Sequence, residues 1–202
     1  MKKEVRLSQL QHSLLMALPF QFAWLVAAFI AYLSGGQGNL ILVVVLVPVL
    51  WAPTLLELIT KANLPSVFQL HFHAFVSASA VAGSGLGLYG FAPNWDTIVH
   101  AYSGLIFAWL GFFMVQAAEV KIKGKLARWF TVLIALATPL ALAVLWELYE
   151  YACDALFGTT MQAGGLEDTI VDMAAAGAGA VIAVLIAIWA KAPRSILPRI
   201  LQ

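Results

Sequence analysis

The stretch ARWFTVLIALATPLALAVLWELYEY, residues 127–151, is long and apolar, with one arginine near its start and Glu147 and Glu150 near its end. A helix needs about 20 apolar residues to span the hydrocarbon core of a bilayer. The stretch therefore predicts a membrane-spanning helix. No basic residue lies near its acidic end, which raises the question of what balances this negative charge.

Five further stretches of similar character lie on either side of this one. Hydrophobic residues make up 62% of the 202 residues and charged residues only 10%, whereas a soluble domain carries about 25% charged residues. The apolar runs are continuous and do not alternate, which excludes membrane strands. We therefore predict an all-α polytopic membrane protein, with residues 1–202 forming a single six-helix domain. The six predicted spans are residues 10–33, 40–59, 67–91, 95–115, 127–151 and 169–190.

The basic residues predict the orientation of these spans. If the N-terminus is cytoplasmic, all 11 Lys and Arg residues fall on the cytoplasmic side of the membrane, as the positive-inside rule requires. Both termini should then be cytoplasmic, in the cytoplasmic membrane of a bacterium or archaeon. The first span follows Lys2, Lys3 and Arg6 but is too long for a typical signal peptide. Nothing in this distribution indicates nucleic-acid binding.

The same topology places seven of the ten acidic residues at the outer ends of spans four to six. His100 is the one side chain there that could carry positive charge. The spacings are helical: Asp96 and His100 are four residues apart, as are Asp168 and Asp172, so each pair shares a helix face. The seven acids are Asp96, Glu147, Glu150, Asp154, Glu167, Asp168 and Asp172.

An ionised acid within the membrane costs about 2.5–3.5 kcal/mol on insertion scales. Solvation in a water-filled mouth, protonation of some acids, or a bound cation would relieve that cost. We expect plain solvation for Asp154 and Glu167, which flank the loop after the fifth span. For the rest we expect a functional polar site, with a divalent metal favoured over a proton relay. Carboxylates with one imidazole suit Mg²⁺, Mn²⁺, Zn²⁺ or Fe.

We predict four metal ligands and two catalytic residues within this site. Glu150 or Asp168 would act as a general base or as a partner that orients His100. The predicted ligands are Asp96, His100, Glu147 and Asp172.

Three motifs carry a resemblance to known membrane proteins. NWDTIVHAYSG, WELYEYACDALFGT and LEDTIVDM, the last followed by a run of small residues, resemble the uncharacterised six-span bacterial inner-membrane proteins of the YjdF type over most of the chain. The order D-x-x-x-H, an acidic helix end and D-x-x-x-D is also similar to the VanZ-like membrane proteins, although the middle motif differs. The resemblance implies a six-helix fold, and it supplies no substrate. The signature positions that it implies are Asp96, His100, Glu147, Asp168 and Asp172.

Three classes of function fit these observations. The first is a metal-dependent enzyme, a hydrolase or transferase, that acts on a membrane lipid or lipid-linked substrate at the outer leaflet. The second is a cation or proton transporter, whose inward path would have to be completed by His71, His73 and Glu57, because the inner halves of spans four to six are apolar. The third is a non-catalytic assembly factor.

Several other patterns have simpler interpretations. A Ser-His-Asp triad of Ser103, His100 and Asp96 is disfavoured because one helix rarely presents all three side chains correctly. Ser103 and Gly104, like the run AAAGAGA, instead predict close helix packing. Glu57 and Lys61 predict a surface ion pair, and His71 and His73 are expected to be interfacial or packing residues.

Overall fold

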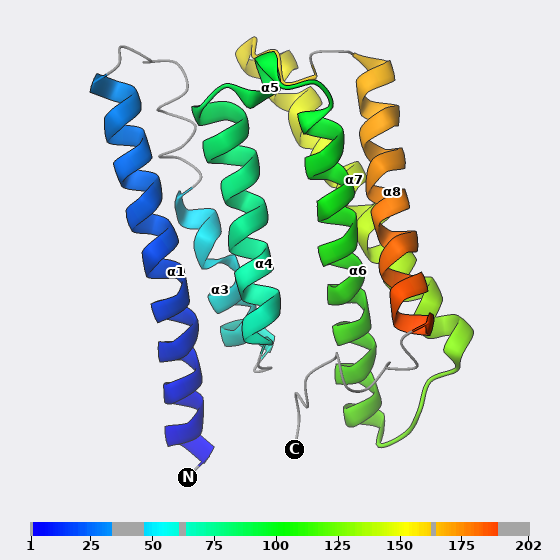
Figure 1. Ribbon diagram of the computed structural model, residues 1–202. Coiled ribbons are helices and arrows are strands. Elements are labelled where there is room, and N and C mark those ends of the chain that lie inside the picture. The colour runs from blue at the N-terminus through cyan, green and yellow to red at the C-terminus, as the bar shows by residue number, and fades with distance from the viewer. Residues whose placement is uncertain (1, 34–46, 61–63, 163–164, 190–202) are drawn as a thin grey trace. The chain divides into compact units, whose positions relative to one another are not determined.

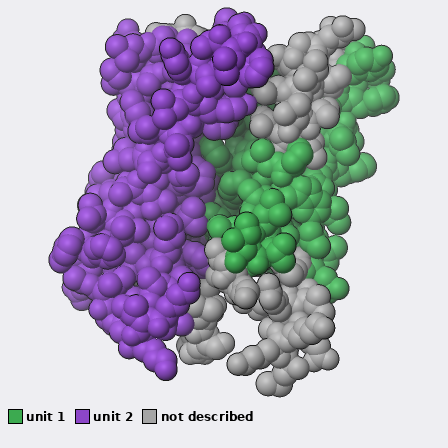
Figure 2. Space-filling view, turned by 180° about the vertical axis from the view of Figure 1, so that it is seen from behind, with its two compact units in different colours: residues 1–95, 200–202 green, residues 96–199 purple. Residues whose placement is uncertain are grey.

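The structure is a computed structural model that describes residues 2–33, 47–60, 64–162 and 165–189 (Figure 1). These residues form helices joined by turns, and no strand occurs among them. Two compact units are present, one of residues 1–95 and 200–202 and one of residues 96–199 (Figure 2). The expectation that residues 1–202 form a single domain stays a prediction.

Four helices in the described part of the chain are long and apolar enough to cross a membrane. They correspond to the first, fourth, fifth and sixth predicted spans. Large apolar side chains are exposed along them, such as Phe22 at 72% and Trp189 at 88%, as expected of surfaces that face lipid. The all-helical, membrane-spanning character of the fold is therefore confirmed. The four are residues 11–30 of α1 (Lys2–Leu33), α6 (Trp95–Ile122), α7 (Arg128–Phe157) and α8 (Leu166–Trp189).

The second and third predicted spans have a less regular structure. In the second, a short 3₁₀ helix, η1 (Val47–Trp51), leads into α3 (Ala52–Thr60), and residues 40–46 lie outside the described residues. The third is not one continuous α-helix, because α4 (Ser66–Ser77) runs into a π-helix and the chain then bends at Gly87. Gly87 has a φ of +80°, a conformation that glycine adopts at little cost. The π-helix is η2 (Ala78–Gly85), and the short α5 (Leu88–Phe91) follows the bend.

Side-chain hydrogen bonds link the helices of the first unit. The indole Nε1 of Trp24 on α1 donates to Ser77 Oγ on α4 at 2.7 Å. The hydroxyls of Ser13 on α1 and Thr54 on α3 lie 2.8 Å apart. Trp24 and Ser13 are each 1% exposed, so both links lie inside the unit and hold α1 against α3 and α4.

The second unit consists of α6, α7 and α8 around a small apolar core. Phe112, Ala135 and Val184, one residue from each helix, are buried together. Gly111 allows α6 to approach α7 closely, since a Cβ at that position would lie 2.8 Å from Ala135 Cα. Glu119 closes the turn between these helices by accepting hydrogen bonds from Lys125 Nζ at 2.6 Å and Leu126 N at 3.0 Å.

Candidate functional site

The site begins at the first turns of α6, where Asp96 and His100 are placed one helical turn apart. Asp96 lies in the first turn of the helix, where the helix dipole favours a negative charge. His100 Nε2 lies 3.4 Å from Asp96 Oδ1. The Asp96 side chain is 38% exposed and that of His100 only 9%, so the pair extends from the surface of the unit into its interior.

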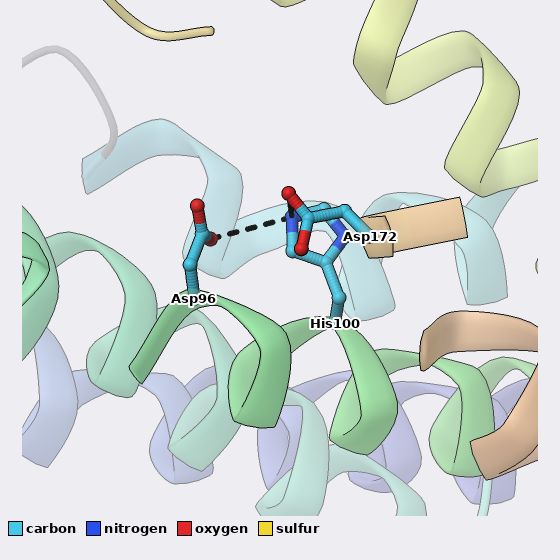
Figure 3. Close-up of side chains that lie close together, drawn as sticks. All are labelled: Asp96, His100 and Asp172. Carbon is cyan, nitrogen blue, oxygen red and sulfur yellow. Dashed lines mark ion pairs between the residues drawn. The ribbon is translucent and has the colours of Figure 1, made fainter. Parts of the chain in front are cut away.

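Asp172 on α8 approaches the same imidazole nitrogen. Its Oδ2 lies 3.8 Å from His100 Nε2, and its side chain is 3% exposed. One ligand atom from each of Asp96, His100 and Asp172 lies within 4.8 Å of the other two, and Figure 3 shows these side chains close together. Ligands bonded at about 2.1 Å to one metal ion lie about 3–4 Å apart. The two distances from His100 Nε2, 3.4 Å to Asp96 and 3.8 Å to Asp172, lie in that range.

The convergence of these residues depends on backbone contact between α6 and α8. A Cβ built at Gly104 would collide with the carbonyl oxygen of Ala176, and one at Gly179 would collide with that of Ala101. Gly104 follows His100 by four residues and Ala176 follows Asp172 by four, so this contact lies one turn beyond the site on both helices. The prediction that Gly104 and the run AAAGAGA allow close packing is confirmed.

Glu147, a predicted fourth ligand on α7, lies beside the cluster of Asp96, His100 and Asp172 rather than within it. Its carboxylate is within electrostatic reach of His100 and Asp172. The residue is 4% exposed, and neither of its carboxylate oxygens has a hydrogen-bond partner in the described part of the chain. A buried carboxylate without a donor is costly, so Glu147 offers two unfilled oxygens at the edge of the cluster.

The two predicted catalytic residues lie around the same cluster. Glu150 is 9% exposed and accepts a hydrogen bond from Trp146 Nε1 at 2.7 Å, within electrostatic reach of Asp96 and His100. Asp168 is half-buried. It precedes Asp172 by one turn of α8 and is within electrostatic reach of it. The catalytic role of both carboxylates stays a prediction.

The hydroxyl of Ser103 is not arranged as a catalytic nucleophile. Its Oγ donates to the carbonyl oxygen of His100 at 2.7 Å, and the residue is buried. A hydroxyl that bonds to the preceding turn of its own helix is a common arrangement for Ser within helices. This contact agrees with the prediction that Ser103, His100 and Asp96 do not form a Ser-His-Asp triad.

Asp154 has a structural role that the sequence did not indicate. Its Oδ1 accepts from Thr159 Oγ1 and from Met161 N at 2.7 Å, and its Oδ2 accepts from Gln162 N at 2.9 Å. α7 ends just before Gly158, which has a φ of +66° and donates its N–H to the Asp154 carbonyl. Asp154 therefore shapes the start of the loop that follows α7. Glu167 is exposed in the first turn of α8, as expected of a solvated acid.

Long apolar helices and a buried carboxylate–histidine cluster together indicate an integral membrane protein with several apolar helices. The chain belongs to the family described as "Predicted membrane protein (DUF2238)", which it matches over residues 13–192. The expected relation to membrane proteins of the YjdF type is confirmed at this level.

The curated proteins include a relative in Thermotoga maritima, named "Uncharacterized protein", which is 25% identical over 123 residues. The match covers 61% of this chain and 62% of the relative, so it spans less than two thirds of the relative's length. No solved structure matches the chain.

Proposed function

We propose that the protein spans the cytoplasmic membrane of a bacterium or archaeon six times, with both termini in the cytoplasm. The sorting of all 11 basic residues to one side supports this orientation. The cluster of Asp96, His100 and Asp172 then opens on the outer side of the membrane, near the loop that follows α7.

Cysteine labelling of intact cells tests this orientation. Cys153 is the one native cysteine, so the background is Cys153→Ala. Thr160→Cys, in the loop after α7, should react with a membrane-impermeant maleimide, whereas Lys121→Cys, at the other end of α6, should react only after lysis. If only Lys121→Cys were labelled in intact cells, the protein would have the opposite orientation, with its termini outside.

The site binds a divalent metal ion through Asp96, His100 and Asp172, with Glu147 as the fourth ligand. The main support is that ligand atoms of the first three residues lie within 4.8 Å of one another. In the described part of the chain, no Lys or Arg forms a salt bridge with any of these carboxylates. A cation supplies the missing positive charge, and carboxylate and imidazole ligands suit Mg²⁺, Mn²⁺, Zn²⁺ or Fe.

The metal site serves an enzyme that acts on a lipid or lipid-linked substrate at the outer leaflet. Asp96, His100 and Asp172 would hold a metal ion that, when bound, would polarise a substrate oxygen or activate a water molecule, and Glu150 or Asp168 would accept or return the proton. The partial exposure of Asp96 supports access to the cluster from one side. A phosphate group would meet several carboxylates at this site, so it binds only when the metal supplies positive charge.

A transport function has less support in the second unit. Beyond the site, Phe112, Ala135 and Val184 form an apolar core with Trp109, Val132, Leu136 and Ala187 packed around it. A cation path through these helices needs polar groups to replace the water that the ion loses. The apolar core therefore favours an enzyme over a transporter.

Elemental analysis of the purified protein tests the metal site. We expect about one divalent ion per chain for wild type, and a loss of at least tenfold in occupancy for Asp172→Asn and His100→Gln. Glu167→Gln is the matched control, because Glu167 is an exposed acid on the same helix as Asp172. If wild type holds no divalent ion after incubation with Mg²⁺, Mn²⁺, Zn²⁺ and Fe²⁺ in turn, the proposal is wrong.

A further inference from the structure

A second buried polar cluster lies in the first unit, at Glu57 on α3 and at Gln69 and His73 on α4. These residues are 5%, 1% and 1% exposed. Gln69 and His73 are four residues apart and share a face of α4. The prediction that Glu57 forms a surface ion pair with Lys61 is wrong about the surface, because Glu57 is buried. Lys61 lies outside the described residues.

One half of this cluster is fixed by hydrogen bonds. Glu57 Oε1 accepts from the backbone N–H of Leu64 at 2.7 Å and from Gln69 Nε2 at 3.1 Å. Gln69 Nε2 also donates to the carbonyl oxygen of Leu64 at 3.1 Å. Both protons of the Gln69 amide are thereby used, and the amide is held with its nitrogen toward Glu57.

The other half of the cluster has no partner. Glu57 Oε2, Gln69 Oε1 and both ring nitrogens of His73 are buried without a hydrogen-bond partner in the described part of the chain. The two oxygens are acceptors, and a neutral imidazole adds one donor and one acceptor. His73 is packed against Phe20, with ring centroids 5.0 Å apart. The Ser13 hydroxyl on α1 is a further donor beside Glu57. Among the described residues no salt bridge reaches Glu57, and the cluster has more buried acceptors than donors.

We propose that the first unit binds one monovalent cation, a sodium ion or a proton, between Glu57 Oε2 and Gln69 Oε1. The charge decides the class of ligand. Glu57 contributes one negative charge, so a single positive charge leaves the cluster neutral, whereas a divalent ion would leave a net charge buried away from water. A sodium ion takes oxygen ligands, and a proton on Glu57 Oε2 would form an O–H donor for the amide oxygen of Gln69. This site is independent of the metal site on α6 and α8.

The thermal stability of the full-length protein in detergent tests the sodium ion. Sodium chloride is compared with choline chloride at equal ionic strength. At tenfold above its dissociation constant, sodium should raise the Tm of wild type by about 3–6 °C. Glu57→Gln should remove this rise and Gln69→Met should weaken the apparent affinity at least tenfold. Glu119→Gln is the control acid, and Asp172→Asn should keep the sodium response while losing the divalent ion.

Infrared spectroscopy of wild type and Glu57→Gln tests the proton. If sodium has no effect on Tm, wild type should show a protonated-carboxyl band that Glu57→Gln removes. Should Glu57→Gln fail to fold, the Gln69→Met variant should shift that band, because its hydrogen-bond acceptor is gone. The proposal is overturned if the Tm does not respond to sodium and wild type lacks a band assignable to Glu57. A bridging water would then account for the cluster, whatever the outcome at the metal site.

Discussion

Glu57 in the first unit and Glu147 in the second are both buried glutamates, and their surroundings differ in one respect. Glu57 has one oxygen saturated by Leu64 N–H and the Gln69 amide, and one oxygen left over. Neither oxygen of Glu147 has a donor among the described residues, and its charged neighbours there are other carboxylates and His100. The described residues therefore stabilise half of one carboxylate by hydrogen bonds and neither oxygen of the other.

The two clusters also differ in how they are held in place. The first unit fixes Glu57 through hydrogen bonds to a turn and a side chain. The second unit fixes Asp96, His100 and Asp172 through backbone contact between α6 and α8 at Gly104 and Gly179. A site set by backbone contact fails as a whole when that contact is lost, whereas a site set by side chains loses one interaction at a time.

The largest expected loss of stability comes from adding a side chain at the close contact between α6 and α8. Gly104→Ala puts a Cβ against the Ala176 carbonyl oxygen, so α6 and α8 must separate, at a cost of about 3 kcal/mol in the free energy of unfolding. Divalent metal should be lost with the contact. Denaturant unfolding and elemental analysis of the purified variant measure the two effects.

Gly177→Ala is the matched control for this substitution. Gly177 lies on the same helix, but its Cβ would meet Leu140 Cδ2 at 3.4 Å, an ordinary contact. Replacing a helical glycine there should stabilise the protein by about 0.5–1 kcal/mol and leave the metal bound. Equal stabilities for Gly104→Ala and Gly177→Ala would show that α6 and α8 are not held by close backbone contact.

A smaller effect separates the two glutamates. Glu147→Gln should weaken divalent metal binding about 10–100-fold and, in chelator, stabilise the metal-free protein by about 1 kcal/mol, because an uncompensated buried charge is removed. Glu57→Gln should leave divalent affinity unchanged. Titration calorimetry and melting curves in chelator measure both properties. A drop in metal-free stability for Glu147→Gln would mean that protein groups already stabilise its charge.

The sequence predicted the site better than it predicted the first unit. Asp96, His100 and Asp172 converge as their helical spacing indicated, because α6 and α8 are regular helices whose faces can be read from residue number. The environments of Glu57 and Asp154 could not be read in this way. Their donors come from turns, Leu64 for one and residues 159–162 for the other. Turn geometry depends on tertiary packing and leaves no periodic signal.

The third predicted span shows a second limit of the sequence pattern. Residues 67–91 are apolar enough to read as one helix, yet α4 gives way to a π-helix and then to the bend at Gly87. Apolar length predicts membrane burial, but glycine-rich stretches leave the backbone several conformations. The pattern therefore indicated an apolar helical stretch and did not indicate the shape that its backbone takes.

Pulsed EPR of the Mn²⁺-loaded protein is the most direct test of whether His100 and the carboxylates around it bind a divalent metal ion. Mn²⁺ suits carboxylate-rich ligand sets, and ¹⁵N-labelled histidine identifies any imidazole bound to it. We expect a hyperfine coupling from one histidine nitrogen that His100→Gln removes and His73→Gln preserves. A bound Mn²⁺ without nitrogen coupling, or a coupling that survives His100→Gln, would show that His100 is not a metal ligand.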